Sequence, residues 1–291
     1  MLDPIRGARR GTLIIFIIAH FALTAVVNLV FFAGNAFRPL ASATGGLLTG
    51  SLIANLVFIA VLVGVIILFG GRLRLSDLGL APRRLPADLL AALGLWSAAQ
   101  IIHLIAGWWT SGAVAFNPEW VERGAGFMLG LLLMQIVGNA LFEEIAYRGF
   151  LLPQLYLRLT HLAAHPWARL LIALLLSQAA FALSHIPNRI YLGMPAAEIG
   201  ADLLMLLGWG AFYSLIYLRS GSLLLVVAVH ALGNAPTTIF ATAPRLAGGG
   251  ESLLIYTLAL LAIFVIPALR RRVRPRLDAD LVAEAAALER V

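Results

Sequence analysis

Eight long apolar stretches set the strongest limit on what this chain can fold into. Each has about 20 residues or more, the length that an α-helix needs to cross the hydrocarbon core of a bilayer. Hydrophobic residues make up 61% of the chain and charged residues only 12%, against about 45–50% and about 25% in soluble domains. The sequence therefore excludes a water-soluble globule and predicts an all-α, polytopic membrane protein with eight transmembrane helices. The predicted spans are about 12–34, 48–70, 86–111, 126–152, 168–187, 200–219, 222–242 and 251–269.

The basic residues predict how these spans are oriented. All 21 are arginine, and with the N-terminus inside, 17 of them fall in cytosolic segments and 4 in outer loops. Because basic residues accumulate on the cytoplasmic side of membrane proteins, both termini are predicted to be cytosolic, in a prokaryotic cytoplasmic membrane. This placement also accounts for the net charge of +7 without nucleic acid as a partner. Residues 270–291 are predicted to form a cytosolic tail.

Two adjacent glutamates stand out in the fourth span. Glu143 and Glu144 are the only glutamates predicted to lie in the interior of a span, where an ionisable group is costly and is a functional candidate by default. On a helix, Glu144 shares a face with Arg148, four residues on, so these two can form an ion pair. Glu143 then remains as a spare carboxylate, about 100° away around the helix axis. The alternative is that the cluster only pins helices together.

The fifth and seventh spans each carry an imidazole with a neighbour at four-residue spacing. Phe181 can pack beside His185, and Asn234 shares a helical face with His230. Taken alone, each pair is equally compatible with an interfacial residue or with interhelical packing. A carboxylate, two imidazoles and an amide on three helices are, however, the groups that a water-activating site needs. Four further polar residues are predicted only to form hydrogen bonds between helices: His20, His103, Asn28 and Asn55.

These residues resemble the three motifs of the CAAX prenyl protease and bacteriocin-processing family, whose members include type II CAAX prenyl endopeptidases. The family's motifs are E-E-x-x-x-R, F-x-x-x-H and H-x-x-x-N/D, in that order on separate spans. The matching residues are Glu143, Glu144 and Arg148, then Phe181 and His185, then His230 and Asn234. The resemblance covers about residues 126–242, which would be the catalytic core of one integral-membrane protease domain spanning residues 1–291.

The resemblance implies an eight-helix enzyme that cleaves a peptide bond of a membrane-tethered protein or peptide, as in CAAX-type processing. Glu143 would be the general base, and His185 would orient the attacked water. His230 and Asn234 would stabilise the oxyanion. Glu144, Arg148 and Phe181 would be supporting residues.

Three alternatives remain open from the residues. A Glu with two His is an accepted zinc-ligand set, so Glu143, His185 and His230 would be the ligands of a metal-dependent version. A transporter or proton relay would use Glu143 and the histidines as proton carriers, and a non-catalytic scaffold would use none of them. One tension accompanies every version: the predicted spans place His185 near the outer end of its helix and His230 about eight residues from the cytosolic side.

Overall fold

The structure is a computed structural model, and it describes residues 6–35, 37–160, 165–241 and 250–266. The described residues are helical with short connections, and the one pairing of extended backbone among them is an isolated bridge between Phe116 and Phe240. The predicted tail, 270–291, lies outside the described residues. The helices are α1 Arg10–Val26, α2 Arg38–Ala43, α3 Gly50–Phe58, α4 Leu85–Ser111, α5 Glu119–Glu122, α6 Ala125–Leu133, α7 Ala140–Glu144, α8 Leu152–Arg158, α9 Pro166–Ser184, α10 Ile186–Tyr191, α11 Ala196–Ser220, α12 Leu223–Asn234 and α13 Gly250–Val265.

Six of the predicted spans are helices long and apolar enough to cross a membrane. Three of them contain π-helical segments, in which the hydrogen bonds run from i to i+5: such segments extend α1 and α3, and two of them join α6, α7 and α8 into one span. The all-α class and the membrane character are thus confirmed, whereas eight crossing helices are not. The six crossing helices are Arg10–Phe31, Gly50–Gly70, Pro82–Ser111, Ala125–Arg158, Pro166–Tyr191 and Ala196–Ser220.

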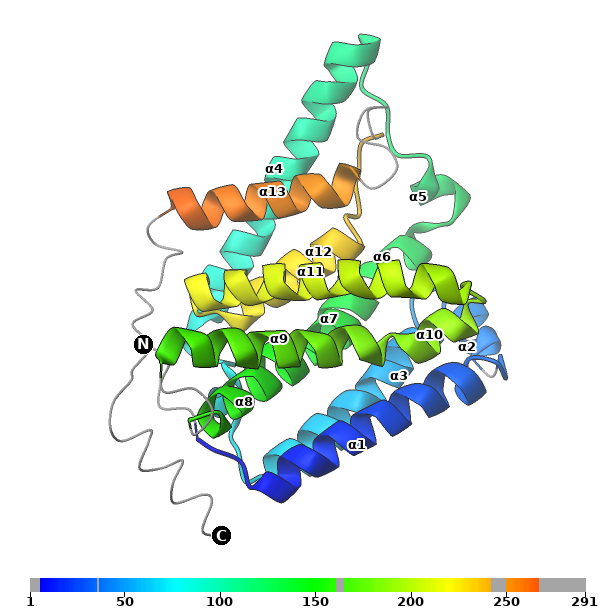
Figure 1. The fold of residues 1–291 in the computed structure, drawn as a ribbon. Coiled ribbons are helices and arrows are strands. Elements are labelled where there is room, and N and C mark those ends of the chain that lie inside the picture. The colour runs from blue at the N-terminus through cyan, green and yellow to red at the C-terminus, as the bar shows by residue number, and fades with distance from the viewer. Residues whose placement is uncertain (1–5, 36, 161–164, 242–249, 267–291) are drawn as a thin grey trace.

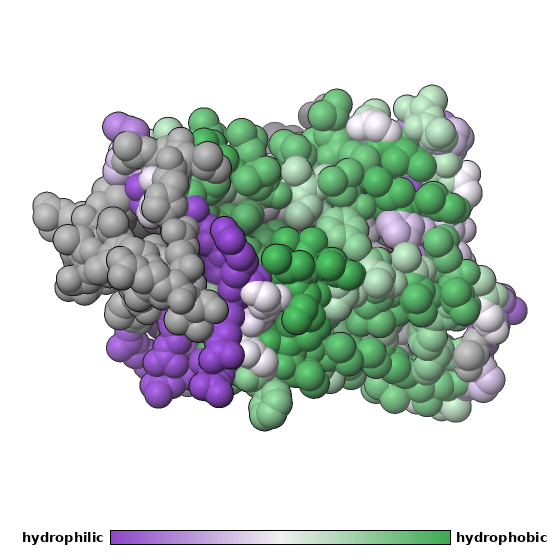
Figure 2. Space-filling model, turned by 60° about the horizontal axis from the view of Figure 1, so that its bottom comes forward, coloured by the Kyte–Doolittle hydropathy of each residue, from purple (hydrophilic) through white to green (hydrophobic). Residues whose placement is uncertain are grey.

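The surface of these helices supports a lipid environment. Large apolar side chains on several spans are mainly exposed, among them Ile18, Phe69, Leu90 and Leu204. Figure 2 shows hydrophobic residues over most of one face, with the hydrophilic ones gathered toward one end. Apolar surface on this scale is unfavourable in water and is satisfied by lipid chains. The chain is therefore an integral membrane protein.

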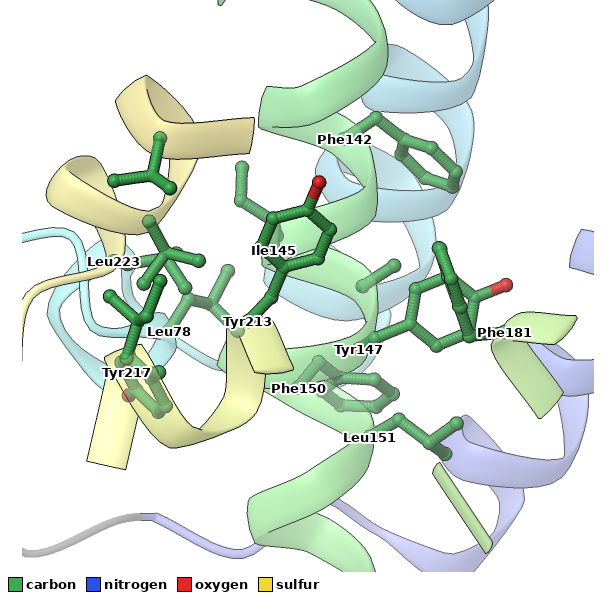
Figure 3. Close-up of a cluster of buried hydrophobic side chains, with 14 of the residues drawn as sticks. Leu78, Phe142, Ile145, Tyr147, Phe150, Leu151, Phe181, Tyr213, Tyr217 and Leu223 are labelled. Atoms are coloured by element: carbon green, nitrogen blue, oxygen red, sulfur yellow. The ribbon is translucent and has the colours of Figure 1, made fainter. Parts of the chain in front are cut away.

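The span Ala125–Arg158 lies at the centre of the bundle. In Figure 1, α1 and α3 lie on one flank of α7, while α4 and α13 lie on the other, and α9 and α11 run side by side across it. Every residue from Glu144 to Gln154 is buried. Figure 3 shows Tyr213 on one side of this helix and Phe181 on the other, with the helix's own Tyr147 on the side of Phe181. The two glutamates therefore belong to the most enclosed segment of the fold.

Gly149 allows the connection before α4 to approach this central helix. A Cβ atom at Gly149 would lie 2.6 Å from the carbonyl oxygen of Leu78, closer than a side chain tolerates. Leu78 ends a short 3-10 turn, Leu75–Leu78, and a second turn follows at Pro82–Arg84. The two turns lie between the second and third spans. The glycine lets them close one end of the bundle over the core.

The predicted seventh span, 222–242, is much shorter in the structure. Helix α12 has 12 residues, so it rises about 18 Å, well short of the roughly 30 Å of hydrocarbon. It ends at Asn234 because Pro236 has no N–H to donate to the carbonyl of Leu232. Most of its residues are buried against α4, α7, α11 and α13. Helix α12 is thus apolar because it is buried in protein. An apolar sequence alone does not distinguish burial in protein from contact with lipid.

Candidate active site

The carboxylate of Glu143 lies between two imidazoles. Its Oε1 is 3.7 Å from Nε2 of His185, and its Oε2 is 3.6 Å from Nε2 of His230. Glu143 belongs to α7, His185 ends α9, and His230 belongs to α12. The Glu143 side chain is 12% exposed, so it is enclosed but still accessible to small molecules. The structure thus brings together the three side chains on which the predicted site depends.

His185 is held by the end of its own helix. Pro187 has no N–H for the carbonyl of Leu183, and the chain leaves the α9 geometry with His185 N bonded to the carbonyl of Ala182. The last carbonyls of a helix lack helical partners, and that of Phe181 accepts a bond from the His185 ring. This bond, from Nδ1, is 2.8 Å long. The Phe181 ring also meets the imidazole edge-on, with centroids 4.8 Å apart, so the predicted neighbour relation is confirmed.

His230 is held by a different kind of partner. Its Nδ1 is 2.7 Å from Oε1 of Glu144, and the ring is stacked on that of Tyr213, with centroids 4.2 Å apart. Because an ionised carboxylate only accepts hydrogen bonds, Nδ1 of His230 carries the hydrogen. That leaves Nε2 directed toward Glu143. The sequence did not reveal this contact, because nothing in the helical spacing relates Glu144 to a residue 86 positions away.

The predicted ion pair between Glu144 and Arg148 is confirmed. The two side chains are fully buried, with 3.1 Å between Arg148 NH1 and Glu144 Oε1. Buried charges need further partners, and the other guanidinium nitrogens have them. NH2 donates to Oε1 of Gln178 at 3.0 Å and to the carbonyl of Gly210 at 2.8 Å, while Nε donates to Ser214 at 3.3 Å. Arg148 therefore fixes Glu144, and Glu144 in turn fixes His230.

Asn234 is placed less tightly than the histidines. It lines the same cavity as Glu143, and its amide donates to Oε1 of Gln135 at 3.3 Å. Asn139 donates to the same oxygen at 3.4 Å. The predicted shared face of His230 and Asn234 is thus directed toward the cavity, although only the imidazole lies next to the carboxylate.

Glu143, Phe181, His185, His230 and Asn234 line one cavity of about 690 Å³, whereas Glu144 and Arg148 are buried and are not among its lining residues. Besides the motif residues it is bordered by polar side chains from α1, α3 and α10, so the cavity is polar as well as enclosed. The polar lining residues outside the motifs are His20, Thr24, Asn28, Ser51, Asn55, Gln135, Asn139, Tyr147, Ser184, Asn188, Arg189, Tyr213, Ser252 and Tyr256.

Comparison with known proteins gives one match. Residues 125–236 match the Rce1-like family of type II CAAX prenyl endopeptidases. This confirms the resemblance drawn from the three motifs, and it covers α6 to α12. No curated protein and no solved structure matches the chain. The Rce1-like segment supports a membrane-embedded protease and does not favour a transporter.

The predicted difference in depth between the two histidines is absent from the structure, because α12 starts inside the protein. The turn that connects α11 to α12 in the Rce1-like segment is buried: Ser220 and Ser222 are almost inaccessible, and Arg84 donates to the carbonyl oxygens of Ser220 and Gly221. Helix α12 therefore starts inside the protein, whereas the first residues of α9 are exposed. His230 reaches the level of His185 although far fewer helical residues precede it.

The zinc alternative was also tested against the geometry. Tetrahedral zinc with bonds of about 2.0–2.1 Å holds its ligand atoms about 3.3 Å apart. Glu143 is 3.6 and 3.7 Å from the two imidazoles and presents a different oxygen to each. Among the described ranges, no group of three or more His, Cys, Asp or Glu side chains is arranged to hold a metal ion. The described geometry therefore gives no support to the zinc set.

The four polar residues set aside in the sequence analysis differ in their surroundings. Asn28 bonds Asn188 and His20 bonds Tyr147, so both connect helices as predicted. Asn55 bonds only within its own helix, to Ser51, and His103 has a buried Nδ1 without a partner in the described part of the chain. His20 also lines the cavity. Helical spacing could not indicate this, because the partners of His20 lie on other spans.

Proposed function

We propose that this protein is an intramembrane endopeptidase that hydrolyses a peptide bond of a membrane-associated substrate, in the CAAX-type processing class. The observation that carries the proposal is the position of the Glu143 carboxylate, within 3.7 Å of the Nε2 atoms of both His185 and His230 in a polar cavity. In this proposal Glu143 activates the attacking water, because no group of three or more His, Cys, Asp or Glu side chains among the described residues is arranged to hold a metal ion.

The hydrogen bonding of His185 supports a role in orienting that water. The carbonyl of Phe181 only accepts, so Nδ1 of His185 carries the hydrogen and Nε2 of the neutral ring presents a lone pair. A water between Nε2 and Oε1 of Glu143 would donate one hydrogen to each. Its oxygen lone pair then faces away from both acceptors, toward a substrate carbonyl. Glu143 removes the proton as the oxygen attacks.

His230 and Asn234 are proposed to stabilise the oxyanion that forms. A donor role for His230 requires a hydrogen on Nε2 as well as on Nδ1, and the resulting positive charge would sit beside Glu144 and Glu143. The side-chain amide of Asn234 supplies N–H donors of its own. Preorganised donors in an enclosed site are the largest single source of transition-state stabilisation in many hydrolases.

The proposed reaction balances through Glu143. The water oxygen bonds to the carbonyl carbon while its proton passes to Glu143, and the C–N bond breaks as Glu143 delivers that proton to the leaving nitrogen. The products are a new carboxylic acid and a new amine, and transfer of the acid's proton to the amine gives a carboxylate and an ammonium group. Both chain termini on the cytosolic side of a prokaryotic inner membrane, and residues 126–242 as the catalytic core, belong to the same proposal.

The test uses purified protein in proteoliposomes with a fluorogenic, prenylated CAAX-type peptide in water enriched in ¹⁸O. The expected result is cleavage with one ¹⁸O atom in the new carboxylate, and unchanged turnover after treatment with EDTA. Turnover that EDTA removes and added zinc restores would overturn the metal-free mechanism. Proton flux across the vesicles without cleavage would replace the protease with a transporter.

A further inference from the structure

A buried row of hydrogen bonds reaches His185 from the first span. Nε2 of His20 is 2.7 Å from the hydroxyl of Tyr147, which donates to the hydroxyl of Ser184 at 2.8 Å. Ser184 donates to the carbonyl of Phe181 at 2.8 Å, and this is the carbonyl that accepts from Nδ1 of His185. The row thus connects α1, the central span and the end of α9.

From His20 to Ser184 the donors point the same way, toward the Phe181 carbonyl. Because the Tyr147 hydroxyl donates to Ser184, its oxygen is left to accept from Nε2–H of His20. The Phe181 carbonyl has two lone pairs, and Ser184 and His185 each use one. Hydrogen bonds arranged head to tail polarise one another, so each strengthens the next. His20 is therefore the first donor of the row, and the Phe181 carbonyl is its last acceptor.

Packing alone does not account for a histidine at position 20. The ring lies among aromatic side chains, stacked on Phe16 and close to Phe58 and Phe142, where an apolar ring would fit. His20 is almost fully buried, and its Nδ1 has no hydrogen-bond partner among the described residues. A buried polar atom without a partner is unfavourable. What the imidazole adds at this position is its bond to Tyr147.

We propose that His20 and Tyr147 are positioning residues for His185, and the inference rests on the proposed protease function. Through Ser184 they hold the Phe181 carbonyl in the direction that accepts from Nδ1 of His185. That bond selects the tautomer whose Nε2 accepts a hydrogen from the attacked water. The first span, which lies outside the segment matching the protease family, thereby contributes to the orientation of the nucleophile.

The test compares single-atom and isosteric changes by steady-state cleavage of the fluorogenic peptide. Tyr147→Phe keeps the ring and removes the hydroxyl, and His20→Leu removes the donor. Both are expected to lower kcat about tenfold with KM unchanged, the range seen when the partner of a ligating or catalytic histidine is lost. His20→Gln, whose amide can donate in place of Nε2, is expected to recover kcat to within about threefold of the wild type.

The matched control is Tyr156→Phe, which removes a buried tyrosine hydroxyl that makes no hydrogen bond within the described residues. It is expected to leave kcat unchanged. A second comparison repeats Tyr147→Phe in a His185→Asn background, where its effect should fall below twofold because the residue it positions is gone. An equal loss in both backgrounds, or full activity of both Tyr147→Phe and His20→Leu, would overturn the inference.

The activity of Glu143→Gln distinguishes failure of the positioning role from failure of the protease proposal. If Glu143→Gln is inactive while the His20 and Tyr147 variants are fully active, only the positioning role fails. If Glu143→Gln keeps its activity, the proposed function itself fails.

Discussion

The two imidazoles beside Glu143 are held in opposite ways. His230 is 4% exposed and is bonded to a carboxylate that is itself fixed by the fully buried guanidinium of Arg148. His185 is 19% exposed and is bonded to a neutral backbone carbonyl, that of Phe181. A carboxylate partner favours an additional positive charge on the ring, whereas a carbonyl orients the ring without supplying charge. The difference matches a donor role for His230 and an acceptor role for His185.

The largest effect is expected at Glu143, which faces both imidazoles. Glu143→Gln keeps the size of the side chain and removes its basicity, so we expect kcat to fall about 10²- to 10⁴-fold, the usual contribution of a general base. Thermal stability should be unchanged. Glu119→Gln is the control, because Glu119 is half exposed and outside the cavity. A kcat of Glu143→Gln within tenfold of the wild-type value would contradict the general-base role of Glu143. The comparison of the two imidazoles beside it would then have no catalytic meaning.

Arg148→Met tests how much the fold depends on the buried ion pair of Glu144 and Arg148. It leaves Glu144 buried without its counter-charge, for which we expect a loss of about 3–5 kcal/mol in the free energy of unfolding. Arg189→Met is the matched change, since Arg189 pairs with Asp202 where both side chains are partly exposed, at 18% and 13%. Its loss should be clearly smaller. Denaturant titration in mixed micelles measures both, and equal losses would contradict the structural role assigned to burial.

A double variant separates the effect of the Glu144–Arg148 pair on stability from its effect on catalysis. Combining Glu144→Gln with Arg148→Met removes both buried charges, and neutral replacement of a buried ion pair often restores stability. We expect the double variant to be more stable than Arg148→Met alone. Its kcat should nevertheless remain about 10- to 100-fold below wild type, because His230 has lost its carboxylate. Recovery of kcat together with stability would show that the pair only supports the fold.

The smallest effect is expected at Asn234. Gln135→Leu removes the oxygen that accepts from both Asn234 and Asn139, and one hydrogen bond is worth about 1 kcal/mol, or about fivefold in rate. We expect kcat to fall by about this factor with KM unchanged. Gln100→Leu removes an equally buried glutamine that bonds Ile239 outside the cavity, and it should leave kcat unchanged. Equal losses in both variants would indicate a general packing effect.

The contacts that lie within one helix were predictable from the sequence. The ion pair of Glu144 with Arg148 and the packing of Phe181 on His185 both follow from four-residue spacing on a helix. The helical class and six of the spans follow in the same way from apolar length. Each of these features depends on local geometry that the chain repeats at every turn.

The contacts between helices were not predictable. The bond from His230 to Glu144 and the row that begins at His20 join residues 86 and 127 positions apart, and a single sequence carries no signal for such pairs. The seventh span was overestimated for a related reason. An apolar helix enclosed by other helices has the same composition as one enclosed by lipid, so the sequence predicts a crossing helix where the structure has the short α12.

The central claim is that Glu143, His185 and His230 act on one water as a unit, and a double-mutant comparison tests it most directly. Groups that act together show strongly non-additive losses. In single-turnover cleavage, His185→Asn should lower the rate more than tenfold in the wild-type background and less than about threefold in the Glu143→Gln background. Equal, multiplicative losses in the two backgrounds would show that the carboxylate and the imidazole do not share a task, and would contradict the account.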